Sequence, residues 1–337
     1  MALIVPEPEK KKPKVVIAPI EKPKPLTPAE VSATAQQLIA NVEKVVVGKR
    51  EQVVLAVAVM LAEGHALIED VPGVAKTMLA RALAVSAGCT FRRIQCTPDL
   101  QPTDVLGQPR LDPVTGRTEF HFGPLFAQLV LVDEINRASP RTQAALLEAM
   151  GEASVTEGNV TYRLQKPFMV IATQNPIEQE GTFLLPEAQK DRFLIRMSLG
   201  YPSLNDEKEM VERFQLRHPI ETLQPVATPD RILKCQEAVR EVKMPVEEND
   251  FILKIVRATR EHPALLLGAS PRASLGLFRA AQAMAAIGGR DSASLEQIKH
   301  LAQKVLAHRL IVRREEKFRD VKVDAVVQEI LNQGLPS

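Results

Sequence analysis

Residues 65–88 read HALIEDVPGVAKTMLARALAVSAG and predict a strand, a short loop and an amphipathic helix in direct succession. The loop ends in Lys76 and Thr77, the last two positions of the phosphate-binding spacing G-x-x-x-x-G-K-[ST]. Two positions where that spacing has glycine hold Asp70 and Ala75. The loop by itself is therefore a weak match, and an ordinary turn before a helix is the alternative.

The strand before the loop and the helix after it favour the phosphate-binding interpretation. The first turn of a helix offers free N–H groups and a positive dipole end to an anion, and Lys76 and Thr77 fall in that turn. The ammonium would reach the terminal phosphates and the hydroxyl would bind Mg²⁺. The residues expected to contact the nucleotide here are Pro72, Gly73, Val74, Ala75, Lys76, Thr77 and Met78.

The two replaced glycines lead to two expectations. An alanine at position 75 costs up to about 1–2 kcal/mol, but only if the backbone there is left-handed. A carboxylate that faced the triphosphate would repel it, so we expect the side chain of Asp70 to point elsewhere.

A second motif follows about fifty residues later, where the apolar stretch LVLVDE (129–134) ends in two acids. Charged groups at the end of a buried strand need partners. Beside a phosphate loop, Asp133 would hold Mg²⁺, and Glu134 would orient and polarise the attacking water. An acidic strand end in solvent is the alternative, which the combination with Lys76 and Thr77 disfavours.

The next apolar stretch, FMVIATQN (168–175), ends in an amide. Asn175 would lie beside the strand of Glu134, where it could donate a hydrogen bond to the γ-phosphate or to the water. A turn cap before Pro176 explains the same residue equally well.

Short apolar runs alternate with helical stretches over residues 29–200, which predicts a parallel α/β sheet covered on both faces. The predicted strands are 65–70, 91–95, 129–134, 168–175 and 192–199. Two hairpins are expected to project from the sheet, at about 105–123 and 153–165. A linker at 201–214 leads to a domain at 215–337 that reads as helix throughout, and the Lys/Pro-rich tail at 1–28 is expected to be disordered.

Several residue pairs predict where helices begin and end. Hydroxyl caps followed by proline stand at Thr27, Thr228 and Ser270, and Ser294 with Gln297 forms a capping box. The matching stop signals are Pro245, Pro263 and Gly288.

Composition argues against several other classes of protein. The net charge is +2, but the first 25 residues hold six Lys and three Glu, which leaves the remainder at about −1. With no Trp and two Tyr, nucleic acid is disfavoured as the main ligand. The longest apolar run, 53–62, is too short to span a membrane, and no secretory signal is present, so we expect a cytoplasmic protein. Three cysteines fit free thiols in a reducing compartment.

Three longer stretches resemble the MoxR group of AAA+ ATPases, and the resemblance covers residues from about 35 to 335. They are DEINRASPRTQAALLEAMGE (133–152), ATQNPIEQEGTFLLPEAQKDRF (172–193) and GASPRA (268–273). The resemblance implies an AAA+ P-loop fold, with an αβα nucleotide domain followed by an all-helical lid. It also implies ATP and Mg²⁺ as cofactors, and it offers a reason for Ala75, since MoxR-like sequences often place Ala before the loop lysine.

The resemblance also implies roles for residues outside the loop. Asn175 would be the sensor-one residue, and Arg192 would be the finger that reaches the γ-phosphate of a neighbouring subunit. Arg272 would be the sensor-two residue that closes the lid over the nucleotide of its own subunit. Val47 and Gly48 would lie against adenine. The two hairpins would match inserts that face the pore and the substrate.

At the level of function, the resemblance implies a homo-oligomeric ring, expected to be a hexamer, that hydrolyses ATP to ADP and phosphate. The free energy would remodel a protein client during maturation or assembly, with a von Willebrand factor A domain protein as one candidate partner. Three alternatives stay open: the motor subunit of a metal chelatase, a nucleotide-gated scaffold with little turnover, which Asp70 and Ala75 suggest, and a DNA-remodelling AAA+ protein.

Overall fold

Five parallel strands form the central sheet. The computed structural model describes residues 26–111, 116, 118–157, 160–175, 182–215 and 218–333, so most of the expected tail at 1–28 lies outside the described residues. The strand order is β2-β5-β8-β1-β9, and every neighbouring pair is parallel. The bounds are β1 (Ala66–Glu69), β2 (Phe91–Gln95), β5 (Leu129–Asp133), β8 (Met169–Gln174) and β9 (Ile195–Met197). Each lies inside one of the five predicted stretches, which confirms the predicted sheet.

The side chains of β5 alternate between two hydrophobic cores, one on each face of the sheet. Leu129 and Leu131 belong to the core that includes α1 to α3 and the lid, whereas Val130 and Val132 belong to the core that includes α4 and α5. The helices are α1 (Pro28–Glu43), α2 (Arg50–Leu61), α3 (Lys76–Ser86), α4 (Pro102–Leu106) and α5 (Pro140–Glu152). Short connecting turns are η1 (Pro124–Phe126), η2 (Ile135–Arg137) and α6 (Glu187–Lys190). Because the strands are parallel, we call the edge where they begin the amino edge and the edge where they end the carboxyl edge.

The helix starts predicted from hydroxyl caps are confirmed. The Thr27 side chain accepts a hydrogen bond from the Glu30 amide at the start of α1, and the Glu30 carboxylate accepts one from the Thr27 amide in return. The side chains of Thr228, Ser270 and Ser294 also accept a hydrogen bond from a backbone N–H of the first helical turn, and Ser294 forms a capping box with Gln297. Each such cap satisfies a backbone N–H that has no partner within the helix.

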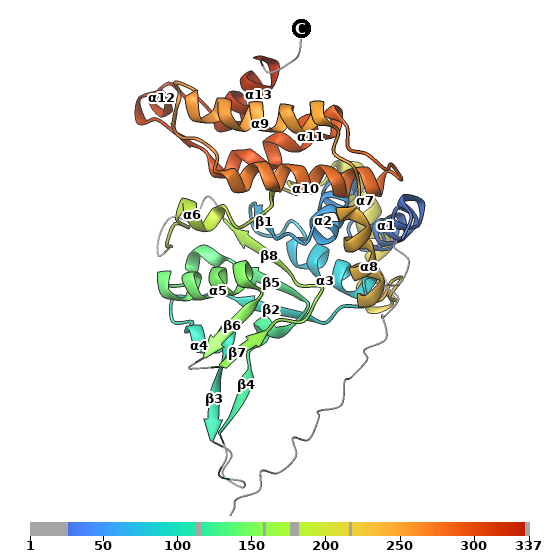
Figure 1. Cartoon of the computed structure of the whole chain (residues 1–337). Helices are drawn as coiled ribbons and strands as arrows, with labels where there is room; N and C mark the ends of the chain where they lie inside the picture. The colour runs from blue at the N-terminus through green and yellow to red at the C-terminus, as the bar shows by residue number, and fades with distance from the viewer. Residues whose placement is uncertain are drawn as a thin grey trace, which may run out of the picture.

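The second domain is a helical lid whose core is continuous with one face of the sheet domain. Figure 1 shows the helices of residues 246–333 on one side of the molecule, whereas the helix of residues 229–240 lies beside α1 of the sheet domain. Helix α10 is next to the sheet domain, where it contacts α1 and α2. Its elements are η3 (Pro219–Glu221), α8 (Pro229–Arg240), α9 (Val246–Glu261), α10 (Pro271–Ile287), α11 (Leu295–Leu306), η4 (Ala307–Arg309), α12 (Arg314–Phe318) and α13 (Val323–Gln333).

Three details of the chain after residue 200 differ from the expected pattern. The lid contains a short antiparallel ribbon of β10 (Leu265–Leu267) and β11 (Ile311–Val312), which forms from an apolar run placed after Pro263 has ended α9. The segment 201–214, expected to be a linker, contains helix α7 (Leu204–Phe214), and no residue of that helix is buried. Pro245 precedes the first residue of α9 and does not end α8.

Two antiparallel hairpins project from the sheet domain at the end far from the lid (Figure 1). One pairs β3 (Gly107–Leu111) with β4 (Thr118–Phe122), and the other pairs β6 (Ser154–Glu157) with β7 (Val160–Arg163). The Phe120 and Tyr162 rings stack across the two hairpins with centroids 4.3 Å apart. This contact links hairpins from distant parts of the chain.

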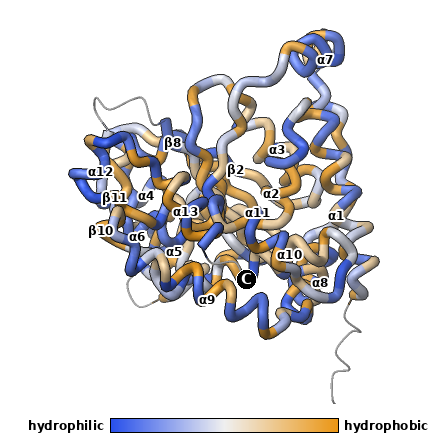
Figure 2. The backbone as a smooth tube through the Cα atoms, turned by 90° about the horizontal axis from the view of Figure 1, so that it is seen from above, coloured by the Kyte–Doolittle hydropathy of each residue, from blue (hydrophilic) through white to orange (hydrophobic). Residues whose placement is uncertain are grey.

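Hydrophobic segments gather in the middle of the molecule, as the colouring of α2 in Figure 2 shows, whereas α7 at the rim is largely hydrophilic. Helix α2 is buried along most of its length, because α1 and α3 of the first domain and α8 and α10 of the lid pack against it. Among the described residues, no helix is both long and apolar enough to cross a bilayer.

His65, just before β1, predicts how stability depends on pH. Its Nδ1 accepts a hydrogen bond from the Val170 amide at 3.0 Å, and its Nε2 donates to the Met150 carbonyl at 3.2 Å. Burial lowers the pKa of His65 from 6.5 to about 4. The unfolded chain therefore binds more protons between these two pH values, so the free energy of unfolding should fall as pH drops through this window, by about 3 kcal/mol in total.

Urea unfolding at pH 7 and at pH 4.5 measures this loss. The His65→Gln variant serves as the comparison, because glutamine does not titrate in this window. Its unfolding free energy should fall less than that of the wild type over the same interval. Equal falls would show that His65 does not contribute to the acid sensitivity.

Candidate active site

Two residues of the loop between β1 and α3 have a left-handed backbone. Gly73 and Ala75 both have positive φ, +86° and +60°. Ala75 therefore occupies the left-handed conformation that costs an alanine about 1–2 kcal/mol. A Cβ at Gly73 would meet nothing within 4 Å, so backbone freedom rather than space explains that glycine. Such alternating backbone turns point successive N–H groups to one side, where they can bind an anion.

Asp70 points away from this loop, as expected. Its Oδ2 accepts hydrogen bonds from the Leu199 amide at 2.6 Å, the Gly200 amide at 2.8 Å and the Ser198 hydroxyl at 3.0 Å. The carboxylate thus anchors the chain that leaves β9, and its Oδ1 accepts a hydrogen bond from the Val71 amide at 3.0 Å. The Lys76 Nζ donates to the backbone carbonyl of Asp70 at 2.9 Å, which holds the ammonium across the loop.

The acid pair at the end of β5 is held by residues of both neighbouring strands. The Asp133 Oδ1 accepts a hydrogen bond from the Thr173 hydroxyl at 2.6 Å, and its Oδ2 accepts from the Arg93 Nη2 at 2.6 Å. Glu134 has a left-handed backbone, with φ +57°. A residue other than glycine in that conformation is uncommon and is typical of functional sites.

Two side chains hold the carboxylate of Glu134. Its Oε2 accepts from the Gln95 Nε2 at 3.0 Å and from the Arg137 Nη1 at 2.9 Å. Arg137 thus forms an ion pair with the acid three residues before it in the chain. Gln95, Arg93 and Thr173 were not singled out from the sequence. Their positions in the sequence could have pointed to them, because all three stand at or near the carboxyl ends of β2 and β8, the two strands that pair with β5.

The loop and the acid pair lie at the same edge of the sheet. Strand β8 lies between β1 and β5, and helix α3, which begins at Lys76, packs against β5. Asn175 follows β8 at this carboxyl edge and is buried. The structure therefore brings together at the carboxyl edge five predicted site residues, namely Lys76, Thr77, Asp133, Glu134 and Asn175.

The donor set at this edge fits Mg²⁺ with a nucleotide. Mg²⁺ prefers oxygen ligands and is usually held through one or two carboxylates together with substrate phosphates. The Thr77 hydroxyl and the Asp133 carboxylate are of this kind. The N-terminus of the eleven-residue helix α3 adds a partial positive charge for the phosphates.

The stretch expected to contact adenine lies against the start of α7. Gly48 has a φ of +71°, and a Cβ there would come within 2.2 Å of the Asp206 carboxyl carbon. Val47 precedes it and is half-buried. The Lys49 Nζ donates to the Tyr201 carbonyl at 2.9 Å. The chain after β9 thus contacts both this stretch and, through Asp70, the phosphate loop.

Arg192 and Arg272 do not lie at the carboxyl edge with the other predicted site residues. Arg192 and Arg272 line a cavity of about 310 Å³ together with Gly64 and His65, which immediately precede β1. This cavity is at the amino edge of the sheet, whereas the phosphate loop follows β1 at the carboxyl edge. The Arg192 Nη1 donates to the Leu147 carbonyl of α5.

The position of Arg272 corrects one expectation. The resemblance implies that Arg272 closes the lid over the nucleotide of its own subunit, but the residue lines a cavity at the amino edge, across the sheet from its own loop. The reason is the anchoring of α10, whose cap Ser270 donates a hydrogen bond to the Asp191 Oδ2 at 2.8 Å. This bond holds the first turn of α10 beside Arg192.

Comparison with known protein families gives matches along both parts of the chain. Residues 65–195 match the model of the ATPase family associated with various cellular activities, and residues 257–330 match the model of the AAA lid domain. The first match runs from the residue before β1 to the first residue of β9, and the second covers most of the lid.

Individual relatives are similar over most of their length. Chaperone MoxR1 of Mycobacterium tuberculosis is 39% identical over 88% of this chain and 81% of its own. Protein MoxR of Methylorubrum extorquens is 30% identical over 84% of this chain and 89% of its own. Uncharacterized protein YeaC of Bacillus subtilis is 47% identical over 87% of this chain and 92% of its own. A crystal structure of a candidate ATPase from Cytophaga hutchinsonii, 36% identical, superposes with a TM-score of 0.85 over 90% of this chain and 95% of that one.

Proposed function

The chain belongs to the MoxR family of AAA+ ATPases, and from this premise we propose that it binds ATP with Mg²⁺ and hydrolyses it to ADP and phosphate. One observation supports this proposal. Lys76 and Thr77, which follow β1, lie at the same edge of the sheet as the two acids that end and follow β5, Asp133 and Glu134. The two alternatives, an acidic strand end in solvent and an ordinary turn before a helix, give no reason for these groups to lie at the same edge.

Each residue of the proposed site has a separate task. Lys76 and the loop N–H groups bind the phosphates, and Thr77 and Asp133 hold the metal. Mg²⁺, when bound, neutralises the charge that develops on the phosphate oxygens. Glu134 orients the attacking water and accepts its proton, and Asn175 donates a hydrogen bond beside it. Gln95 and Arg137 both donate to Oε2 of Glu134, and these two hydrogen bonds orient the carboxylate for its task.

We further propose that the protein works as a ring, expected to be a hexamer, in which Arg192 and Arg272 reach the nucleotide of the neighbouring subunit. Their shared cavity at the amino edge supports this assignment, since their own nucleotide would lie at the opposite edge. By similarity to Chaperone MoxR1, the ring would remodel a protein client. A von Willebrand factor A domain partner and a cytoplasmic location stay predictions.

Phosphate release together with native mass, each with and without ATP, tests the proposed function. Wild type should release phosphate in the presence of Mg²⁺ and should assemble further when ATP is added. The Glu134→Gln variant is the control for contaminating hydrolysis. Equal rates in wild type and variant would contradict hydrolysis at this site and would favour a nucleotide-gated scaffold.

Lys76→Ala should weaken ATP binding by about 10- to 100-fold, since a hydrogen bond to a charged group contributes roughly 1.5–3 kcal/mol. Isothermal titration with a slowly hydrolysed ATP analogue measures the affinity. Arg81→Ala, which removes an exposed cation from the same helix, should leave the affinity unchanged. Unchanged affinity in Lys76→Ala would exclude this loop as the phosphate site.

A further inference from the structure

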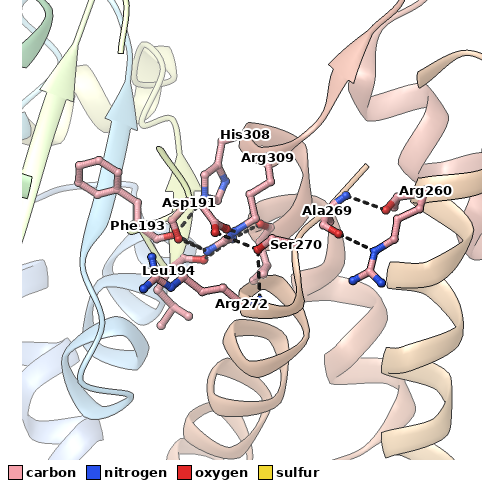
Figure 3. A network of polar contacts seen from close by, with 11 residues as sticks. Asp191, Phe193, Leu194, Arg260, Ala269, Ser270, Arg272, His308 and Arg309 are labelled. Atoms are coloured by element: carbon pink, nitrogen blue, oxygen red, sulfur yellow. Dashed lines mark hydrogen bonds and ion pairs between the residues drawn. The ribbon is translucent and has the colours of Figure 1, made fainter. Parts of the chain in front are cut away.

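A buried guanidinium joins the lid to the segment that carries Arg192. Arg309, in η4, is 5% exposed, and its Nε lies 2.7 Å from the Asp191 Oδ1 (Figure 3). Its remaining N–H groups donate to backbone carbonyls of Asp191, Phe193, Leu194 and Val305. All three nitrogens therefore have acceptors. Three of those four carbonyls belong to the segment 191–194.

Two more lid side chains hold the same segment. The Ser270 hydroxyl donates to the second carboxylate oxygen of Asp191 at 2.8 Å while it also caps α10. The His308 Nε2 lies 3.0 Å from the Phe193 carbonyl. That carbonyl can only accept, so Nε2 carries the proton. Burial, with the nearby Arg309 charge, keeps the pKa of His308 well below its ordinary value, so the ring is neutral near pH 7.

The segment itself has little freedom of its own. Phe193 is fully buried in the core on the α5 side of the sheet, and Asp191 is clamped by the lid. Arg192 lies between these two residues, and its side chain lines the cavity at the amino edge. A rotation of the lid relative to the sheet must therefore either carry Arg192 with it or break a buried ion pair, which is strongly unfavourable.

We propose that Asp191 and Arg309 are positioning residues that couple the orientation of the lid to the placement of Arg192. The lid would thereby set whether Arg192 can reach the nucleotide of the next subunit. This inference rests on the proposed role of Arg192 in trans. Stability alone is a weak reason for such a pair, because buried ion pairs can often be replaced by apolar residues without loss.

The Asp191→Asn variant tests the coupling. We expect a folded protein with wild-type ATP affinity, because the phosphate loop lies at the other edge of the sheet. Turnover should fall by about 10²-fold, as a small misplacement of a reacting group can cause. Asp324→Asn is the matched control, because Asp324 also pairs across the two domains, with the Arg196 Nη2 at 3.2 Å. It should keep wild-type turnover.

A double-mutant comparison separates positioning from general support of the fold. If Asp191 acts through Arg192, adding Asp191→Asn to Arg192→Ala should cause no further loss of turnover. Mixed assemblies with Lys76→Ala subunits, which have an intact Arg192, should restore part of the activity of Asp191→Asn. Losses that multiply in the double variant, or mixed assemblies that stay inactive, would overturn the inference.

Arg309→Lys provides a second variant if Asp191→Asn does not fold. Lysine keeps the charge that faces Asp191 but cannot bond all the carbonyls at once. We expect the same loss of turnover without loss of ATP affinity, and the same lack of additivity with Arg192→Ala. If wild type does not hydrolyse ATP, the proposed function itself fails. If wild type hydrolyses ATP and both positioning variants match it, only the coupling fails.

Discussion

Arg192→Ala subunits are expected to bind ATP as tightly as wild type and to lose turnover by about 10³- to 10⁵-fold. The affinity should persist because Arg192 lies at the amino edge of the sheet, away from the phosphate loop of its own subunit. Turnover should be lost because a guanidinium supplied by a neighbour stabilises the charge of the phosphoryl transition state. Phosphate release at saturating ATP and titration of an ATP analogue measure the two quantities.

Mixed rings give the decisive control for this variant. Glu134→Gln subunits have an intact Arg192, so they should restore part of the turnover when mixed with Arg192→Ala subunits. Arg279→Ala, which removes an exposed arginine lining the same cavity, should behave as wild type. Full activity of the pure Arg192→Ala protein would refute a role across the interface.

Glu134→Gln should lower turnover by about 10²- to 10⁴-fold, the usual contribution of a general base. Glutamine has nearly the same shape as glutamate but cannot accept the proton of the attacking water. ATP affinity should stay close to that of wild type, since Lys76 and Asp133 are unchanged. Single-turnover phosphate release and nucleotide titration measure the two effects.

The matched control is Glu148→Gln, which makes the same substitution at an exposed position on α5. It should leave both turnover and affinity unchanged. A Glu134→Gln protein that keeps wild-type turnover would argue that another group activates the water. A variant that loses both affinity and turnover would assign Glu134 to nucleotide binding.

Local patterns along the chain are sufficient to predict the strands of the central sheet. The run LVLVDE places β5 and the acids that follow it, because a strand buried on both faces reads as a continuous apolar run. The caps at Thr27 and Ser294 mark helix starts because their hydrogen bonds span only three residues. Such signals do not depend on the rest of the fold.

How the lid packs against the sheet domain cannot be predicted from local patterns. Asp191 meets Ser270 and Arg309 from 79 and 118 residues away, and no local pattern encodes that meeting. These contacts place Arg272 at the amino edge of the sheet. The resemblance alone implies a different position, over the nucleotide of its own subunit. The orientation of Asp70 likewise depends on amides that follow β9.

The sequence alone thus determines the strands of the central sheet, the helix starts at Thr27, Thr228, Ser270 and Ser294, and the acids and cation that end or follow particular strands. Periodicity and capping are enough for these features because they act over a few residues. Which of these groups face one another, which backbone Ala75 adopts and which edge each arginine occupies follow only from packing. The physical reason is that the free energy of burying the lid against α1 and α2 comes from contacts between distant segments.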